Sequence, residues 1–418
     1  MEKKKILMLS DHALSTSGVG CQSRFLIQGL IEKGNWTVRQ FGAAIRHESY
    51  DLIEVTKDFI IKPVDGFGNR DMILQALVTE KPDVLFLFTD PRFFTWLWEI
   101  EDEVRQICPI AYWHVWDNDP FPDFNNPYYE STDLINCHSH MTFDLIKDRH
   151  PEKTGFIPHA LPESIFFPIS DADINEARIH SLGVERKDDF VLFWVNRNAR
   201  RKRPADLLLA WKNFIETAKK DYPNSRVPAT LLMHTDPLDQ EGPNLYAVAE
   251  NLGIIDSIVF STQRIEFEKM NILHNISDAC INISYAEGFG LATLEAMQCG
   301  KPVIATKTGG LTRQVVDHRD QSENGIALDV KFRTLVGSQS VPYIFEDYSS
   351  IEDTSDAIYK LFSMSPDERK SLGEKARDYV TSEFSFQKTV DLWNDSLEKL
   401  VNNWKKSKRK KWSLEEIK

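Results

Sequence analysis

The sequence predicts an α/β protein built from two doubly wound parallel-sheet domains. Short apolar, β-branched runs alternate with longer amphipathic stretches, and this rhythm restarts after Pro168. Continuous apolar runs, such as residues 84–88, are typical of strands that are buried on both faces of a sheet. Two successive series of alternating strands and helices therefore predict two parallel sheets.

In the first half, apolar runs predict strands over residues 5–10, 37–41, 84–88, 110–113, 134–137 and 155–157. Helical spacing predicts helices over residues 23–33 and 72–79, and the first of these stops at Gly34. Prolines cluster between Pro158 and Pro168, so we expect the hinge between the domains there.

In the second half, strands are expected over residues 190–195, 229–234, 258–261, 279–284, 302–306 and 326–328. The helices expected between them cover residues 204–219, 244–252, 265–271, 291–298 and 311–316. From Ser365 to Lys406 the pattern is helical. We divide the chain into Rossmann-like domains over residues 1–165 and 166–383, a helix over 384–406 and a basic tail over 407–418.

Composition limits the class of protein. The chain has 418 residues and a formal net charge of -13, which disfavours wholesale nucleic-acid binding. No apolar run approaches the ~20 residues of a membrane span, and the apolar stretch near the N-terminus is too short for a signal peptide. Five scattered cysteines fit a reducing compartment, so we expect a cytoplasmic protein.

In parallel sheets, ligands bind beyond the carboxyl ends of the strands, so two facing sheets create one cleft. The first informative loop contains Gly18 and Gly20 before a helix. Glycines let the backbone approach a ligand, and a helix start offers N–H groups to an anion. A tight strand-to-helix turn is the alternative interpretation.

The loop after residues 190–195 carries five cations within seven residues, at Arg197, Arg200, Arg201, Lys202 and Arg203. A diphosphate carries about two to three negative charges, which charge-assisted hydrogen bonds hold best. A solvated basic turn is the alternative, and the place beside the cleft favours the phosphate interpretation.

The segment 284–297 is the most informative. Glu287 lies in a loop after a strand, Gly288 and Gly290 follow, and Glu295 lies one turn into the next helix. This pattern predicts an anion-binding helix start with a carboxylate on either side. Carboxylates accept pairs of hydrogen bonds from sugar or ribose hydroxyls. Thr308-Gly309-Gly310 is a second glycine-rich phosphate candidate.

The motif from Glu287 to Gly310, Glu-Gly-Phe-Gly-Leu-x-x-Leu-Glu-Ala-Met-x-x-Gly-Lys-Pro-Val-Ile-Ala-Thr-x-x-Gly-Gly, resembles the signature of family-4-like retaining glycosyltransferases with the GT-B fold. The first glycine loop, the spacing of Arg197 and Lys202, residues 157–168 and residues 379–400 are also similar to this family. Three places depart from the family's pattern: Asn196, Arg203 and His159-Ala160.

The resemblance implies a hexosyltransferase that uses a nucleotide-diphosphate sugar, UDP- or GDP-linked, with retention and without a metal or other cofactor. Arg197 and Lys202 would neutralise the diphosphate, and Glu295 would bind the ribose. Glu287 and His114 would contact the transferred sugar. The backbone would hold the donor at the remaining predicted positions: Gly18, Gly20, Gly288, Phe289, Gly290, Leu291 and Ala292.

Rival interpretations remain. His138-Ser139-His140 has a spacing used by zinc hydrolases, although no acidic residue completes a ligand set. Asp117-Asn118-Asp119 is similar to a metal-binding motif of the one-domain glycosyltransferase fold, or is an acceptor loop or a plain turn. A catalytically inactive sugar-nucleotide-binding protein would share the fold. A sugar phosphorylase would need a pyridoxal-binding lysine, for which there is no clear candidate.

The acceptor stays open among glycan, lipid, small metabolite and modified nucleic-acid base. An aromatic stretch that would stack on a sugar or base, or pack in the core, consists of Trp96, Trp98, Trp113, Trp116, Phe121 and Phe124. The basic run over residues 405–411 is a solvated tail or a weak contact with membrane or nucleic acid.

Overall fold

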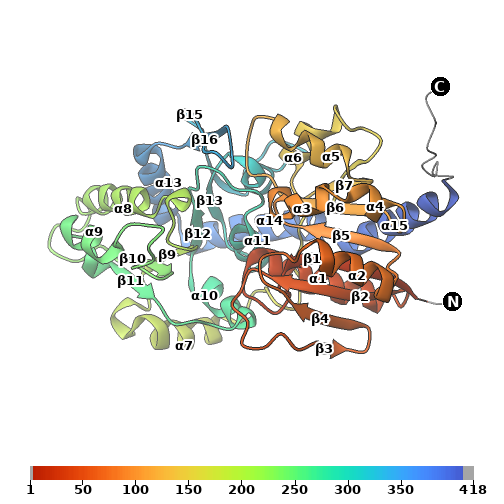
Figure 1. The fold of residues 1–418 in the computed structure, drawn as a ribbon. Coiled ribbons are helices and arrows are strands. Elements are labelled where there is room, and N and C mark those ends of the chain that lie inside the picture. The colour runs from red at the N-terminus through yellow and green to blue at the C-terminus, as the bar shows by residue number, and fades with distance from the viewer. Residues whose placement is uncertain (1–2, 408–418) are drawn as a thin grey trace, which may run out of the picture.

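A computed structural model describes residues 3–407, which form two α/β domains lying side by side (Figure 1). The eight-stranded sheet of the first domain runs, in spatial order, β3 (Ile53–Thr56), β4 (Phe59–Pro63), β2 (Trp36–Ala43), β1 (Lys4–Asp11), β5 (Val84–Phe88), β6 (Ile110–His114), β7 (Leu134–Cys137) and β8 (Thr154–Phe156). Neighbouring strands are parallel, except that β3 pairs antiparallel with β4. The α-helices of this domain are α1 (Gly18–Glu32), α2 (Arg70–Glu80), α3 (Thr95–Trp98), α4 (Glu101–Arg105), α5 (Asn126–Glu130) and α6 (His140–Lys147).

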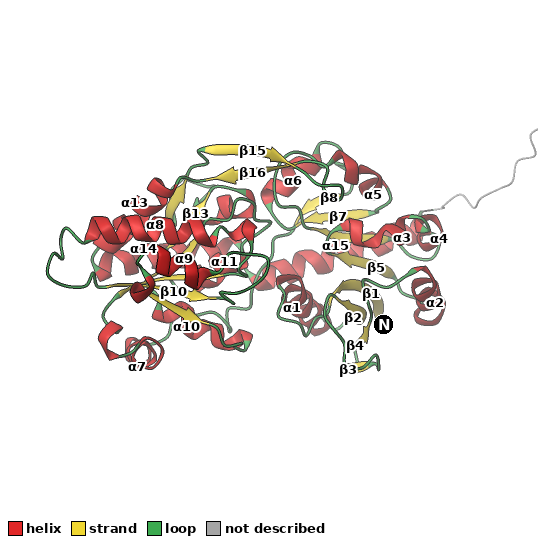
Figure 2. Ribbon diagram, turned by 60° about the vertical axis from the view of Figure 1, so that its left-hand side comes forward, coloured by secondary structure: helices red, strands yellow, loops and turns green. Residues whose placement is uncertain are grey.

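The second sheet has six parallel strands in the order β11 (Ile258–Ser261), β10 (Ala229–His234), β9 (Phe190–Val195), β12 (Ala279–Asn282), β13 (Val303–Thr306) and β14 (Gly325–Leu328). The helices of this domain are α7 (Asp171–Leu182), α8 (Pro204–Ala218), α9 (Leu245–Asn251), α10 (Met270–Ile276), α11 (Leu291–Gln298), α12 (Thr312–Val315), α13 (Ile351–Ser363) and α14 (Pro366–Glu383). An antiparallel hairpin, β15 (Phe332–Val336) and β16 (Ile344–Tyr348), reaches from this domain toward the first (Figure 2).

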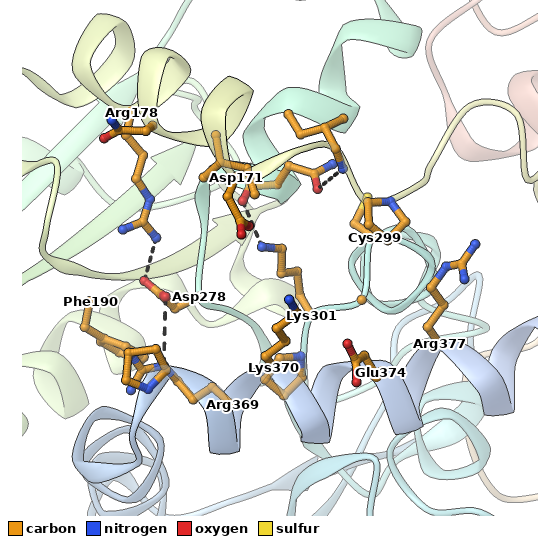
Figure 3. A pocket seen from close by; sticks show the side chains of 18 of the residues that line it. Asp171, Arg178, Phe190, Asp278, Cys299, Lys301, Arg369, Lys370, Glu374 and Arg377 are labelled. Atoms are coloured by element: carbon orange, nitrogen blue, oxygen red, sulfur yellow. Dashed lines mark hydrogen bonds and ion pairs between the residues drawn. The ribbon is translucent and has the colours of Figure 1, made fainter.

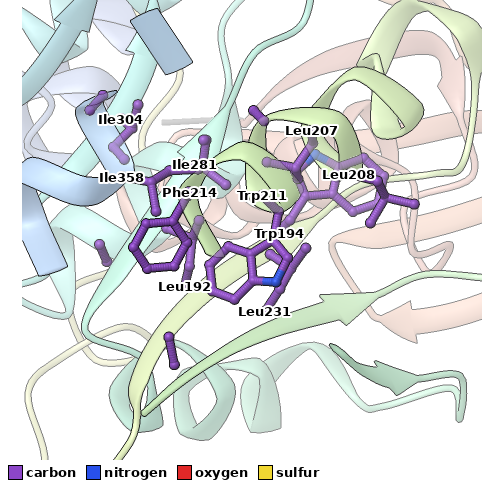
Figure 4. Packing of buried hydrophobic residues seen from close by; sticks show 14 of the residues in the cluster. Leu192, Trp194, Leu207, Leu208, Trp211, Phe214, Leu231, Ile281, Ile304 and Ile358 are labelled. Atoms are coloured by element: carbon purple, nitrogen blue, oxygen red, sulfur yellow. The ribbon is translucent and has the colours of Figure 1, made fainter. Parts of the chain in front are cut away.

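The core of the second domain lies between its sheet and the helices α8 and α13. Figure 4 shows Trp194 of β9 and Trp211 of α8 among aliphatic side chains such as Ile281 and Ile358. The indole N–H of Trp211 donates to the hydroxyl of Ser257 at 2.9 Å, so this buried ring also satisfies its one polar group.

The last helix, α15 (Phe386–Lys406), returns to the first domain, where it appears blue in Figure 1. The fully buried ring of Trp393 lies 4.8 Å from Phe86 and 5.2 Å from Trp113, between ring centroids. A Cβ atom on Gly29 of α1 would lie 3.0 Å or less from the side chain of Val390, so the two helices pack closely. The helix is therefore part of the first domain's core.

Several elements were not predicted from the sequence. The strands β3 and β15 lack a continuous apolar run, because β3 is an exposed edge strand and β15 is mostly exposed. The helices α7 and α13 were also missed, and α10 begins at Met270, later than the helix expected over residues 265–271. The basic tail lies, beyond Ser407, outside the described residues.

Candidate functional site

The loop between β12 and α11 forms a tight, buried turn. The side-chain oxygen of Asn282 accepts hydrogen bonds from the backbone N–H and the hydroxyl of Ser284, at 3.1 and 2.6 Å. Gly290 closes the loop with a φ of 94°, a conformation that favours glycine, and α11 begins at the next residue. Glu287 is thereby held beyond the carboxyl end of β12, where its side chain is buried.

The loop between β9 and α8 supplies two cations to this carboxylate. Lys202 ends a short 3-10 turn (Arg200–Lys202) and forms an ion pair with Glu287. Beside it, Nη1 of Arg201 lies 3.5 Å from the same oxygen of Glu287 and donates to the carbonyl of Ala286 at 2.6 Å. One carboxylate therefore serves two cations at the carboxyl end of the second sheet.

Electrostatics keep this cluster charged. Burial by itself would raise the pKa of Glu287, but the charges of Lys202 and Arg201 outweigh burial and lower that pKa to about 2. Burial also lowers the pKa of Lys202, and the attraction of Glu287 opposes this effect. The carboxylate of Glu287 is therefore ionised near neutral pH.

Two of the predicted ligands have other partners. Arg197 forms two hydrogen bonds to the carboxylate of Asp239, at 2.7 and 3.1 Å, and its side chain is 64% exposed. Glu295 places a carboxylate oxygen 3.0 Å from Nε2 of His274, which is fully buried. The ion pair of Arg197 is therefore made outside the Lys202 cluster, while Glu295 lies inside α11, one helical turn beyond Gly290.

The first glycine loop meets α11 across the domain boundary. The hydroxyl of Ser17 caps α1 by accepting a hydrogen bond from the N–H of Gly20 at 3.0 Å. A Cβ atom on Gly18 would lie 3.2 Å from the side chain of Leu291, so the starts of α1 and α11 are close together. Because the first N–H groups of a helix lack partners within it, both helix starts suit an anion.

The two histidines that follow or end β6 and β7 lie in different places. His114 is fully buried, and its ring nitrogens lie 3.0 Å from the hydroxyl of Tyr112 and 2.8 Å from that of Tyr129. Its predicted contact with a donor sugar stays a prediction. His138 faces the second domain, because a Cβ atom on Gly288 would lie 2.6 Å from its Nε2. Burial lowers the pKa of His138 to about 4, so its ring is neutral at pH 7.

The side chain of Phe289 packs inside the molecule. Its ring lies 5.1 Å from that of His159 and 5.4 Å from that of Phe384, between ring centroids. Its carbonyl accepts a hydrogen bond from the amide of Gln314 at 2.7 Å. Phe289 thus joins the interdomain connection to the end of α14, which fixes the backbone of the adjoining glycines.

The loop over residues 117–119 docks the first domain onto the second. A carboxylate oxygen of Asp117 lies 3.7 Å from Nη1 of Arg201. The amide of Asn118 donates to the carboxylate of Asp347 in β16 at 2.8 Å, and the carbonyl of Asp119 accepts from the hairpin backbone at 2.9 Å. No sequence pattern indicated this docking, because the hairpin itself was not predicted.

The two histidines considered for a metal hydrolase, His138 and His140, point in different directions. His138 points into the interdomain contact, whereas His140 places Nδ1 2.8 Å from Asp144 on the surface of α6. Within residues 3–407, no group of three or more His, Cys, Asp or Glu side chains is arranged to hold a metal ion.

The aromatic stretch considered for the acceptor contributes largely to packing. Trp113 is buried and stacks on Phe88 with centroids 4.3 Å apart. Trp98 stacks on Tyr128, and Phe124 contacts Tyr343 of the loop joining β15 and β16 at 5.2 Å. These rings therefore stabilise the first domain and its contact with the hairpin loop.

A cavity of about 650 Å³ lies elsewhere, at the amino ends of β9, β12 and β13. Figure 3 shows Lys301 within it, between Asp171 on α7 and Lys370 on α14. Asp278 there is 2.7 Å from Arg178 and 3.8 Å from Arg369. Cations and carboxylates are equally numerous in the lining of this cavity, so their charges balance. The size of the cavity alone does not identify it as the functional site.

Solved structures share the arrangement of two facing domains. Sucrose-phosphate synthase from Thermosynechococcus elongatus is similar over 96% of this chain and 100% of that one, with a TM-score of 0.73 and 18% identity. HepE from Anabaena, solved with UDP and glucose, is similar over 95% of this chain and 100% of that one, with a TM-score of 0.69 and 16% identity. The fold is that of GT-B proteins, which confirms the predicted fold class.

Residues 176–379 match the family model described as Glycosyl transferases group 1, in agreement with the resemblance found in the sequence. D-inositol 3-phosphate glycosyltransferase from Acidothermus cellulolyticus is 29% identical over 43% of this chain and 38% of its own length. N-acetyl-alpha-D-glucosaminyl L-malate synthase from Bacillus anthracis is 23% identical over 63% of this chain and 59% of its own length. The chain thus matches roughly two fifths to three fifths of these relatives' length. No helix within residues 3–407 has the length and apolar character to cross a bilayer.

Proposed function

We propose that the chain moves a hexose-type sugar from a nucleotide-diphosphate sugar to an acceptor hydroxyl, with retention of configuration and without a metal ion. The observation that carries this proposal is that Lys202 and Arg201 lie together at the carboxylate of Glu287, beside the start of α11. Two cations held together at the carboxyl end of a sheet, beside a helix start, favour an anion of about two charges. The family of the second domain and the UDP and glucose bound by HepE support the same choice.

The residues take separate roles in this proposal. Lys202 would neutralise the diphosphate, and the backbone at Gly290 and Leu291 would donate to its oxygens. Glu295, one turn further along α11, would accept hydrogen bonds from the ribose. When the diphosphate replaces Glu287 as the partner of Lys202, the carboxylate of Glu287 is released to accept bonds from sugar hydroxyls.

The chemistry balances without a protein nucleophile. The bond between the anomeric carbon and the diphosphate oxygen breaks, and its electron pair leaves with the diphosphate. The acceptor oxygen bonds to the anomeric carbon on the same face, and its proton passes to the departing phosphate oxygen. Preorganised cations stabilise the charge that develops on the leaving group. His138, whose neutral ring faces Gly288, is the histidine we propose beside the donor sugar.

The first experiment measures the thermal midpoint with UDP, GDP and ADP in turn, each with EDTA or with Mn²⁺. A nucleotide present at about 100 times its dissociation constant should add roughly 2.7 kcal/mol, a shift of a few degrees at this size. A shift with one nucleotide in EDTA supports the metal-free donor site. No shift with any nucleotide, or a site that appears only with Mn²⁺, would contradict the proposal.

The second experiment incubates the protein with the UDP-, GDP- or ADP-glucose that matches the binding nucleotide and a panel of hydroxyl acceptors. Release of the nucleoside diphosphate, with an α-linked product by proton NMR, is the expected result. Binding without transfer to any acceptor would favour an inactive sugar-nucleotide-binding protein, and a β-linked product would overturn retention.

A further inference from the structure

The carboxyl edge of the first sheet carries polar and aromatic side chains that take no part in the donor site. The strands β4, β2, β1 and β5 are parallel neighbours, so the segments that follow them lie side by side. We call residues 11–17, 44–52, 64–69 and 89–94 the His12 edge. We infer that this edge binds the acceptor, and that the acceptor is an uncharged carbohydrate rather than a phosphorylated sugar. This inference rests on the proposed function, since it requires a sugar-transfer reaction beside the same edge.

His12 follows β1 and brings an unpaired hydrogen-bonding group to this edge. Its side chain is only 3% exposed, and its Nδ1 accepts a hydrogen bond from the backbone N–H of Leu14 at 3.2 Å. Burial, and then the neighbouring His47, lower the pKa of His12, so its ring is neutral at pH 7 and carries its proton on Nε2. Among residues 3–407 this Nε2 has no hydrogen-bond partner. Because a nearly buried N–H group favours a partner, Nε2 is suited to donate to an oxygen of a bound molecule.

The loops after β2 and β4 form one surface beside His12. The rings of His12 and His47 lie 5.8 Å apart, and those of His47 and Tyr50 lie 5.5 Å apart, between ring centroids. Nε2 of His47 lies 3.0 Å from the carbonyl oxygen of Val64, and the hydroxyl of Tyr50 donates to the carboxylate of Asp65 at 2.7 Å. These two contacts join the loops, so a histidine, a tyrosine and a carboxylate adjoin the free Nε2.

An exposed aromatic pair continues this surface. Phe93, in the short turn after β5, is 56% exposed, and its ring stacks on that of Phe67 with centroids 5.1 Å apart. Phe67 lies two residues after Asp65, in the loop that follows β4. Exposed aromatic rings can pack on the apolar C–H face of a sugar ring, while neighbouring carboxylates and imidazoles bind its hydroxyls. The His12 edge offers both kinds of group.

His12 also lies next to a proposed part of the donor site. A Cβ atom on Gly20 would lie 2.6 Å from the carbonyl oxygen of His12, so this residue packs against the first turn of α1. The same turn contains Gly18, which lies beside Leu291 at the start of α11. An acceptor held by His12 would therefore lie close to the helix starts that suit the donor, as transfer to its hydroxyl requires.

The charges of the His12 edge distinguish between classes of acceptor. Its segments contain five carboxylates and two arginines: Asp11, Glu48, Asp51, Asp65 and Asp90, with Arg46 and Arg92. Arg92 is already paired, since its guanidinium donates to the carboxylate of Asp90 at 2.7 Å. This negative excess within the segments would repel a phosphate group on the acceptor, whereas the hydroxyls of an uncharged sugar donate to carboxylates. The same excess disfavours an acceptor presented by a nucleic acid or an anionic membrane.

The first test compares uncharged with phosphorylated acceptors. The full chain is incubated with the UDP-, GDP- or ADP-glucose whose nucleotide binds. The acceptors are glucose, galactose, mannose and N-acetylglucosamine, each uncharged, as its 1-phosphate and as its 6-phosphate. We expect kcat/KM for the best uncharged sugar to exceed that for both of its phosphates by about tenfold or more.

Variants then test the residues. His12→Asn keeps an acceptor for the N–H of Leu14 but removes the donor at Nε2, whereas His12→Gln places an amide N–H near the position of Nε2. We expect His12→Asn to raise the KM of the uncharged acceptor by about tenfold and His12→Gln clearly less, while calorimetry shows nucleotide affinity within about threefold in both. Phe93→Ala should also raise this KM. Phe332→Ala, which alters a similarly exposed phenylalanine in β15, is the matched control and should leave it unchanged.

Several outcomes would overturn the inference while leaving the proposed function in place. One is nucleotide binding with preferred transfer to phosphorylated sugars, a lipid or a nucleic-acid base, or with transfer to none of the uncharged sugars. Another is an equal rise in KM in His12→Asn and His12→Gln together with a lower thermal midpoint, which would make His12 a structural residue. If the wild-type protein binds none of UDP, GDP and ADP, the proposed function fails and the inference fails with it.

Discussion

The two ends of the second sheet each hold a buried cluster of charges around a lysine, and they differ in how the charges are matched. At the amino ends, Arg178 donates to the carboxylate of Asp278 and to three backbone carbonyls. At the carboxyl ends, Lys202 and Arg201 share Glu287. The first cluster is saturated by the protein around Arg178, whereas in the second the guanidinium of Arg201 is about a third exposed and faces the opposite domain, where Asp117 is its second carboxylate partner. The exposure of a cation toward the opposite domain is therefore a better guide to a ligand site than the size of a nearby cavity.

The largest expected effect is on the rate of sugar transfer, and it should distinguish Lys202 from Lys301. Lys202→Ala should lower the rate of sugar transfer by about 100- to 1,000-fold, because it removes a charge that stabilises the leaving diphosphate. Lys301→Ala, in the cavity at the amino ends, is the matched control and should change the rate by about threefold or less. Steady-state kinetics of both variants check this. Similar losses in the two would remove the distinction between the ends.

Removing a partner from the saturated cluster should act on stability instead. Asp278→Asn leaves Arg178 buried without its carboxylate and should lower the free energy of unfolding by about 3 kcal/mol. Urea denaturation measures this loss of stability. At temperatures where the variant is still folded, calorimetry should show that its affinity for the nucleotide is unchanged. A folded variant with weakened nucleotide binding would place the amino-end cluster in the site after all.

The stability of the folded protein should also depend on pH through His138, which follows β7 and faces the second domain. Its folded pKa of about 4 lies below the value of about 6.5 for an unfolded histidine, so the unfolded chain binds the proton more readily. Stability is therefore complete above about pH 6.5 and falls as the pH drops toward 4, by about 2 kcal/mol from this residue at pH 5. Urea denaturation of the wild type and of His138→Asn at pH 7 and 5 tests this. An equal pH dependence in both proteins would rule out His138 as the cause.

A smaller effect concerns the ribose. Glu295→Ala should weaken UDP binding by about tenfold, because a carboxylate that accepts from two hydroxyls is lost. The same variant should no longer distinguish UDP from its 2′-deoxy analogue, which calorimetry can measure. The comparison of the two nucleotides is the control. Loss of the contact between Glu295 and His274 would weaken the binding of UDP and of its 2′-deoxy analogue equally. If GDP or ADP binds instead of UDP, the corresponding pair is used.

The smallest effect has the opposite sign. Glu287→Gln should strengthen binding of the free nucleoside diphosphate by a few fold, since the phosphate no longer competes with a carboxylate for Lys202 and Arg201. Sugar transfer should fall in the same variant, because the acceptor of the sugar hydroxyls is weakened. Calorimetry with the nucleotide and a transfer assay separate the two. Weaker nucleotide binding would mean that Glu287 assists the phosphate site.

Much of the fold could be predicted because its signals are local. The continuous apolar runs predict β5, β7, β9, β10 and β11 with the bounds that the structure has, since strands buried on both faces need apolar residues throughout. The exposed strand β3 and the hairpin carry no such pattern, so they escaped prediction. The glycine-rich loop before α11 was also readable, because a positive φ such as that of Gly290 favours one residue type. Gly18 and Gly20, expected in a loop, instead lie in the first turn of α1.

The sequence by itself determined the two-sheet class, the loops that carry the charges and the place of Glu287 after a strand. Only the tertiary structure decided which charges meet. Arg197 and Arg201 are the same residue type and lie in one loop, yet the contacts of Asn198 tie the first to the loop after β10, while Tyr285 holds the second beside Glu287. The physical reason is that side-chain direction depends on hydrogen bonds between segments far apart in the chain, which no local pattern encodes.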